Sequence, residues 1–187
     1  MAGLTTDLSP WEAMWAAYDE DSYAAVLEQV GATDVVLDIG AGDLRLARRL
    51  AAKVRFVYAL EQQPHPIEQP LPANLRLIVG DARLLPFAAG ITQAVLLMRH
   101  CTHLALYAAK LAAVNCRWLL TNARWGLTVE KVDLRGERRP YHSLAMGWYA
   151  CQCGATGFRP GPPEQLTTAL AEQIHELSDC PNCQPQF

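Results

Sequence analysis

The sequence predicts an α/β protein with a doubly wound, mostly parallel sheet, helices on both faces and a small C-terminal zinc-binding element. Three observations lead to this fold class. Apolar stretches of strand length alternate with stretches of helical periodicity over residues 35–122. Several of these expected strands end in an acid or in glycine. Finally, four cysteines form two close pairs near the C-terminus.

The composition indicates one globular unit of ordinary size with a small appendage. The chain has 187 residues, of which 51% are hydrophobic and 19% are charged. No apolar run approaches the roughly 20 residues of a membrane span, and residues 1–15 lack the basic flank and apolar core of a secretion signal. We therefore expect a soluble, cytoplasmic protein that does not contact membranes.

The first expected elements form a helix and one complete strand–helix unit. Ser9 is a suitable N-cap, and Pro10 and Glu12 follow it in the first turn, so a helix is expected over residues 9–30, with a break near 19–21. Residues 35–39 form a continuous apolar strand except for Asp38, a pattern typical of a strand covered on both faces. Residues 44–52 then have the periodicity of a helix.

Further strands and one helix follow at the spacing of a parallel sheet. Residues 55–60 are expected to form a strand that stops at Glu61, and the proline-rich residues 62–72 to form a loop. The remaining expected elements are strands at 75–79, 94–98 and 117–122 and a helix at 104–114. In such sheets the ligand site lies at the carboxyl ends of the strands.

The pattern changes after residue 124. A strand is expected within 127–134 and a helix over 163–177, with one cysteine pair before this helix and one after it. We place the domain boundary near residue 136, which gives a first domain of residues 1–135 and a C-terminal extension of residues 136–187. The basic segment 135–142 has aromatic residues around it and is the one local candidate for RNA binding, although such segments are more often solvated loops. The net charge of −3 offers no overall attraction to nucleic acid.

The ends of three expected strands suggest a small-molecule site. Gly40 and Gly42 permit a tight turn and a close approach of a ligand to the backbone. Glu61 suits a pair of ribose hydroxyls, because a carboxylate accepts two hydrogen bonds. Asp81 suits the exocyclic amine of an adenine, with a backbone N–H beside it. Each acid taken alone is equally well explained as a solvated strand end.

These stretches resemble the class I S-adenosylmethionine-dependent methyltransferases, which have a Rossmann-like fold. The resemblance covers residues 34–122 and lies in DVVLDIGAGD, YALEQ and LIVGDARLLPF. It implies transfer of a methyl group from S-adenosylmethionine, with the following residues around the donor: Asp38, Gly40, Ala41, Gly42, Glu61, Gln62, Asp81, Ala82 and Arg99.

The chain departs from that family in two places. Leu44 stands where the family usually has a glycine, so the turn is expected to differ there. The aromatic proline motif of enzymes that methylate nucleic-acid amino groups is replaced after the fourth strand by residues 98–103, which argues against such acceptors. In this replacement His100 or His103 is a candidate catalytic proton acceptor and Arg99 a candidate for steering an anionic group. The alternative is that one histidine caps the following helix or is a hydrogen-bonded packing residue.

The cysteine pairs predict a structural metal site. Cys151, Cys153, Cys180 and Cys183 have the close spacing of a four-thiolate zinc site, and disulfides are the rival interpretation. Cys101 and Cys116 lie in apolar surroundings and are expected to be buried free thiols.

Two functions are therefore expected from the sequence. The first is a methyltransferase whose acceptor is a small molecule, a protein or RNA. The second is a non-catalytic S-adenosylmethionine-binding module that recruits a protein or RNA partner through the zinc element. The oligomeric state is left open.

Overall fold

The protein is described by a computed structural model that covers residues 20–63, 69–99, 101–126 and 128–183. A six-stranded sheet has the order β3-β2-β1-β4-β5-β6. Its strands are β1 (Val35–Ile39), β2 (Phe56–Glu61), β3 (Leu75–Val79), β4 (Gln93–Leu96), β5 (Trp118–Thr121) and β6 (Glu130–Asp133). All neighbouring pairs are parallel except β5 and β6. The α/β class and the mostly parallel sheet are thus confirmed.

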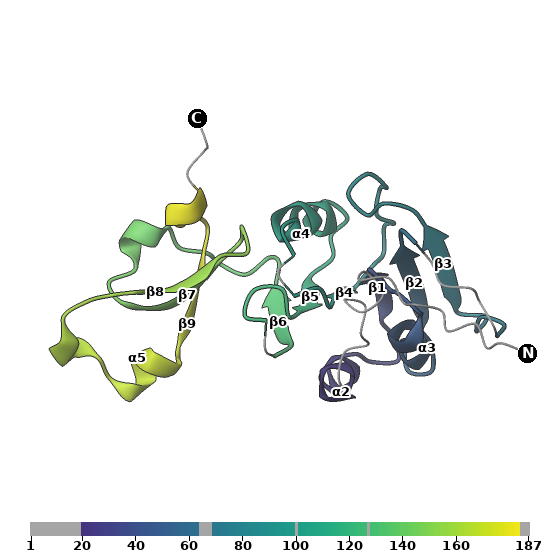
Figure 1. The fold of residues 1–187 in the computed structure, drawn as a ribbon, viewed down its shortest axis with the longest axis horizontal. Coiled ribbons are helices and arrows are strands. Elements are labelled where there is room, and N and C mark those ends of the chain that lie inside the picture. The colour runs from purple at the N-terminus through teal and green to yellow at the C-terminus, as the bar shows by residue number, and fades with distance from the viewer. Residues whose placement is uncertain (1–19, 64–68, 100, 127, 184–187) are drawn as a thin grey trace, which may run out of the picture.

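Helices cover both faces of this sheet. Figure 1 shows α4 (Leu104–Ala113) on one face and α2 (Glu20–Glu28) and α3 (Arg45–Ala51) on the other. Two apolar cores result, one between α2, α3 and the sheet and one between α4 and the sheet. The helix expected over residues 9–30 is confirmed in α2, whereas its first part lies outside the described residues.

The turn between β1 and α3 shows how Leu44 is accommodated. Its backbone is left-handed, with φ at 64°, a conformation that glycine adopts without strain and leucine does not. The Leu44 side chain is nevertheless only 5% exposed and packs in the core under α3. Leu44 therefore keeps a glycine-like backbone, and the burial of its apolar side chain offsets the backbone strain.

A second, three-stranded sheet follows in the order β8-β7-β9. It consists of β7 (Gly147–Cys151), β8 (Thr156–Arg159) and β9 (Ile174–Leu177). The short elements around it are η1 (Tyr141–Ser143), η2 (Pro163–Gln165), α5 (Thr168–Glu172) and η3 (Pro181–Cys183). In Figure 1 this sheet lies beyond β6, at the far end of the molecule from β3.

The helix expected over residues 163–177 is wrong. Only Thr168–Glu172 is α-helical, and Ile174–Leu177 forms the strand β9, which pairs in parallel with β7. The alternation from exposed Ile174 to buried His175, and again to buried Leu177, has the period of a strand. Long-range pairing with β7 thus overrides the helical pattern, which the sequence shows only over a few residues.

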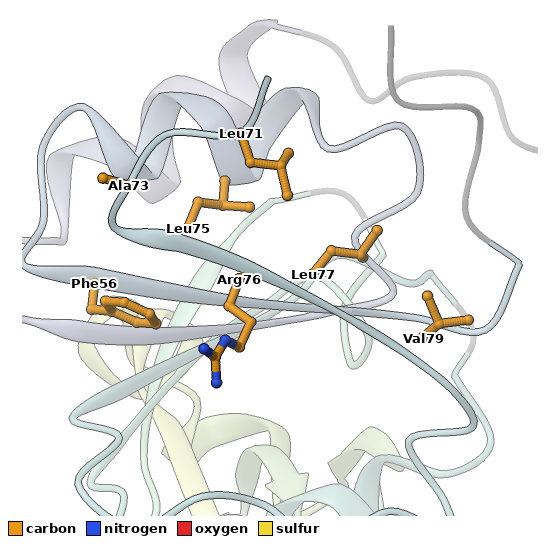
Figure 2. Close-up of a pocket in the computed structure, with 7 residues that line it drawn as sticks. All are labelled: Phe56, Leu71, Ala73, Leu75, Arg76, Leu77 and Val79. Atoms are coloured by element: carbon orange, nitrogen blue, oxygen red, sulfur yellow. The ribbon is translucent and has the colours of Figure 1, made fainter. Parts of the chain in front are cut away.

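A shallow hollow of about 480 Å³ follows the outer edge strand β3. Figure 2 shows Leu71, Leu75 and Leu77 on one side of this strand and Arg76 on the other. None of the polar residues at the carboxyl ends of the other strands lines it. Among the described helices, none has the length and apolar character needed to cross a membrane.

Candidate functional site

Three buried polar side chains lie on one face of the large sheet, at the carboxyl ends of their strands. They belong to Asp38 near the end of β1, Glu61 at the end of β2 and Asn122 directly after β5, and the three residues are 3%, 2% and 1% exposed. Because side chains alternate along a strand, Asp38 and Asn122 share the face of their strand neighbours Val36 and Leu120, which pack in the core under α2 and α3. The same alternation places Glu61 on this face.

The carboxylate of Glu61 holds the glycine turn. It accepts hydrogen bonds from the backbone N–H groups of Gly42 and Gln63, each at 2.9 Å. The carbonyl of Leu60 accepts two more, from Gly40 at 2.8 Å and Ala41 at 3.1 Å. The turn after β1 is therefore tied to the end of β2, and each oxygen of Glu61 already has one partner.

Asp38 is one of two members of the group with an unsatisfied polar atom. Its Oδ2 is buried and has no hydrogen-bond partner in the described part of the chain. Burial raises the pKa of Asp38 from its ordinary value of 3.8 to about 7, and the negative charge of Glu61 adds to the rise. A buried carboxyl oxygen without a partner is costly in the folded state, which makes Oδ2 of Asp38 a candidate acceptor for a ligand.

Asn122 has the same property on the other side of β4. Both its Nδ2 and its Oδ1 are buried without a partner among the described residues. The backbone on either side is held in place, because Thr121 Oγ1 donates to the carbonyl of Leu96 at 2.7 Å and accepts from the N–H of Ala123 at 3.0 Å. Asn122 therefore presents one donor and one acceptor from a rigid position.

Asp81 is engaged by its own loop. Arg83 contacts both carboxylate oxygens through its guanidinium group, at 2.6 to 2.9 Å, and its backbone N–H donates to Oδ1 at 2.8 Å. These bonds hold the pKa of Asp81 down, at about 2. Lys110 of α4 fastens this loop by donating to the carbonyls of Ala82 and Leu85. The adenine contact expected for Asp81 requires Arg83 to move aside.

The residues expected to act in catalysis lie after β4 and remain predictions. His100 lies outside the described residues. His103 is the exposed N-cap residue of α4, where its side chain makes no capping hydrogen bond and its ring lies edge-on to Tyr107. Arg99 is exposed. The other residues expected around a ligand differ in exposure: Gly40 and Gln62 are exposed, and Ala41 and Ala82 are buried.

The four C-terminal cysteines come together as a group that can bind a metal ion. The sulfur atoms of Cys151, Cys153, Cys180 and Cys183 all lie within 4.8 Å of one another. Cys151 Sγ is 3.4 Å from Cys183 Sγ, and Cys153 Sγ is 3.7 Å from Cys180 Sγ, distances well above the roughly 2.05 Å of a disulfide. Burial raises the pKa of Cys180 to about 11, so a thiolate there needs a cation beside it.

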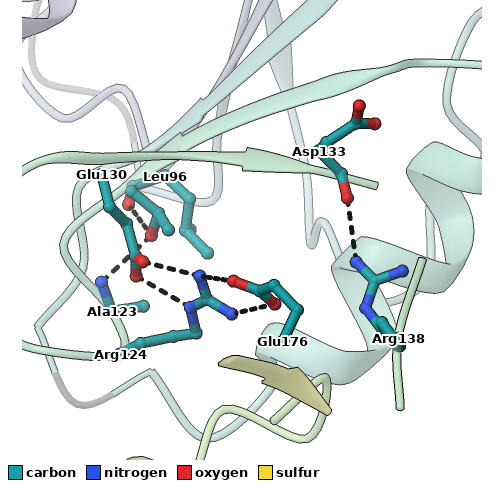
Figure 3. A network of polar contacts seen from close by, with 8 residues as sticks. Leu96, Ala123, Arg124, Glu130, Asp133, Arg138 and Glu176 are labelled. Atoms are coloured by element: carbon teal, nitrogen blue, oxygen red, sulfur yellow. Dashed lines mark hydrogen bonds and ion pairs between the residues drawn. The ribbon is translucent and has the colours of Figure 1, made fainter. Parts of the chain in front are cut away.

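Arg124 links the two sheets. Its guanidinium group makes paired contacts with Glu130 of β6, at 2.8 and 2.6 Å, and with Glu176 of β9, at 2.8 and 2.7 Å (Figure 3). These opposite charges raise the pKa of Arg124 despite its burial. Sequence reasoning missed this contact, because Glu176 lies 52 residues away and no local pattern pairs the two residues.

The basic segment is used largely within the fold. Arg138 donates to the backbone carbonyls of Asp133, Leu134 and Gly136, and Arg135 donates to the carbonyl of Asn115 at 2.5 Å. The backbone of Arg139 forms a bridge to β9. These arginines thus hold the connection between the two sheets.

Comparison with known proteins yields likenesses to solved structures alone. No family model matches the chain, and no curated protein matches it. A solved structure of precorrin 8W decarboxylase from Methanobacterium thermoautotrophicum is similar, with a TM-score of 0.46 and 22% sequence identity. The match covers 56% of this chain and 63% of that chain, so it spans less than two thirds of the decarboxylase. A likeness at this level does not assign an activity to this protein.

The comparisons do not bear out the expected family and activity. No family model and no curated protein matches, and the similar solved structure is named a decarboxylase, so the class I S-adenosylmethionine-dependent methyltransferase prediction is withdrawn. The alternative of an S-adenosylmethionine-binding recruitment module has no support either. In the structure, the carboxylate oxygens of Glu61 and Asp81 already have partners within the chain. Acids after successive strands are thus explained without that cofactor.

Proposed function

We propose that the protein binds a small polar molecule at the carboxyl ends of β1 and β5, through Asp38 and Asn122. The observation that carries this proposal is that Asp38 Oδ2 and both polar atoms of the Asn122 amide are buried without a partner in the described part of the chain. Buried polar groups are normally hydrogen-bonded, and the exceptions in folded proteins need an explanation. A ligand at this edge of the sheet supplies one, since α/β sheets bind ligands there.

The chemistry of the three side chains defines the class of ligand. Asp38 in its ionised form accepts from a hydroxyl or amino group, and Asn122 requires one acceptor and one donor. Glu61 adds a second carboxyl group close enough to raise the pKa of Asp38. An anionic ligand is therefore disfavoured, and a neutral or cationic molecule with neighbouring hydroxyl or amino groups is favoured.

We propose further that the cysteine cluster binds zinc. Four thiolates in one group are the ligand set of structural zinc sites, and a site with four protein ligands leaves no open position for catalysis. The ion stabilises the fold of the C-terminal extension, residues 136–187, which follows the first domain of residues 1–135. Six cysteines without a disulfide suit a reducing compartment such as the cytoplasm.

Thermal unfolding with simple probes tests the ligand site. D-ribose, adenosine and ethanolamine each present neighbouring hydroxyl or amino groups, and inorganic phosphate is the anionic control. At least one of the three is expected to raise the Tm of the wild type, with a smaller rise in Asn122→Leu and none with phosphate. If none of the three raises the Tm, or if the rise is unchanged in Asn122→Leu, the proposed site is wrong.

Metal analysis of the purified protein tests the zinc site. One zinc ion per chain is expected, and Cys183→Ser is expected to lose it. The matched control is Cys101→Ser, which removes a half-buried thiol outside the cluster and should retain the ion. Wild-type protein with intact thiols and no bound zinc after purification in zinc-containing medium would contradict the proposal.

A further inference from the structure

Arg124 occupies a position from which it can connect the cysteine cluster with the ligand site. Its side chain is 4% exposed and lies between two carboxylates, one from each sheet, which are 18% and 33% exposed. Figure 3 shows the guanidinium group with Glu130 on one side and Glu176 on the other. Both contacts have the paired geometry in which arginine and carboxylate bind most strongly.

One end of this contact reaches the ligand site through two peptide bonds. Arg124 is the second residue after Asn122, and the residue between them, Ala123, is anchored to Thr121. The N–H of Gly126 donates to the carbonyl of Asn122 at 2.9 Å, so the segment forms one compact turn. The Asn122 and Arg124 backbones therefore belong to the same turn.

The other end reaches the cysteine cluster. Glu176 lies in β9, and its neighbour Leu177 is in register with the metal-ligand candidate Cys151. The N–H of Gln152 donates to the carbonyl of Leu177 at 3.1 Å. Cys151 ends β7, and Cys180 and Cys183 lie shortly after β9, so an ion bound by the four sulfur atoms would join the ends of the two strands that hold Glu176 in place.

The hydrogen bonds make this contact costly to break. If Glu176 is released, the buried guanidinium group loses two of its four charge-assisted hydrogen bonds and the second sheet loses its polar anchor. A second contact supports the first, since the rings of Trp125 and Trp148 meet edge-to-face with centroids 6.1 Å apart. The junction thus has one defined arrangement when both contacts are made, and coupling requires that the metal-free protein also adopts an arrangement in which they are loosened.

We infer that metal binding at the four cysteines positions the Asn122 amide through the Glu176–Arg124 contact, so that the metal and the strand-edge ligand bind cooperatively. The ligand part of this inference rests on the proposed function above. Coupling of this kind is reciprocal, because any factor by which the metal raises ligand affinity is also the factor by which the ligand raises metal affinity. Arg124 is in this respect a positioning residue that acts through Asn122.

The test uses Glu176→Gln, which keeps the size of the side chain and removes its charge. Its matched control is Glu172→Gln in α5, an exposed glutamate four residues earlier in the same unit. Zinc affinity is measured by chelator competition, and the Asn122 side-chain amide signal is followed by NMR while zinc is added to the metal-free protein. Arg124→Lys serves as a second variant, because it keeps the positive charge but loses the paired geometry. Far-UV circular dichroism shows whether each variant is folded.

Zinc is expected to shift the Asn122 amide signal in the wild type and in Glu172→Gln. In Glu176→Gln and Arg124→Lys the shift should be lost and the zinc affinity should fall about tenfold, a change of about 1.4 kcal/mol. The inference is overturned if zinc leaves the Asn122 signal of the wild type unmoved, or if Glu176→Gln behaves as the wild type does. No ligand is added in this NMR experiment. It therefore tests only the link from the metal to Asn122, whereas the thermal unfolding experiment with the sugar and amine probes tests the ligand site.

Discussion

The pH dependence of folding reveals the state of Asp38. Burial and the charge of Glu61 raise the pKa of Asp38 from 3.8 to about 7 in the folded protein, whereas the unfolded chain keeps the ordinary value. The folded state therefore binds this proton more tightly, and the free energy of unfolding falls as pH rises from about 4 to about 7 and is level above that range. One pKa unit corresponds to about 1.36 kcal/mol, so complete ionisation costs the folded state about 4 kcal/mol.

Asp38→Asn removes this dependence while keeping the shape of the side chain. Urea unfolding of the wild type and of Asp38→Asn at pH 5 and pH 8 isolates the contribution, because other groups titrate equally in both proteins. Relative to Asp38→Asn, the wild type is expected to lose about 3 kcal/mol between pH 5 and pH 8. A difference between the two proteins that is constant with pH would refute the reasoning, since it would mean that Asp38 is ionised at both pH values.

Three further predictions concern other parts of the fold. Arg124→Met leaves two carboxylates without their partner and is expected to lower the free energy of unfolding by about 2 kcal/mol, since both carboxylates are partly hydrated; urea unfolding that matches the wild type would contradict this. Lys110→Met frees the loop carbonyls that the ammonium group binds, so amide hydrogen exchange over residues 82–87 should be faster, and unchanged exchange would show that the loop holds itself. Because the backbone at position 44 is left-handed, Leu44→Gly should have a free energy of unfolding about 1 kcal/mol higher than Leu44→Ala in urea unfolding, although both variants are less stable than the wild type. The opposite order would show that the position is not left-handed in solution.

The parallel sheet could be predicted because its signals are local. The expected strands at 35–39 and 75–79 match β1 and β3 residue for residue, and the other parallel strands differ only at their ends. Mostly apolar runs bounded by turns are sufficient for this, since the central strands β1 and β4 are almost completely buried. The cysteine cluster could be predicted equally well, because the spacing of the four cysteines alone indicates a shared metal ion.

The remaining features depend on contacts between distant residues. The strand β9 could not be separated from the end of a helix by its four residues, and only its pairing with β7 decides. The partner of Arg124 comes from that same strand. The intrachain partners of the acids could not be predicted for a related reason. A carboxylate at a strand end looks the same in sequence whether it binds a ligand, holds a turn as Glu61 does, or pairs with a neighbour as Asp81 does. The family resemblance then joined three such positions into one cofactor site.

The central claim is that the unsatisfied groups of Asp38 and Asn122 form a binding site. The most direct measurement is NMR of ¹⁵N-labelled, zinc-loaded protein during titration with D-ribose, adenosine and ethanolamine, with the Asn122 side-chain amide as the reporter. We expect a saturable shift of this signal with at least one probe, weakened at least tenfold in Asp38→Asn, and no shift with inorganic phosphate. An Asn122 signal that stays in place with all three probes would contradict the claim and would mean that the buried amide is satisfied within the protein.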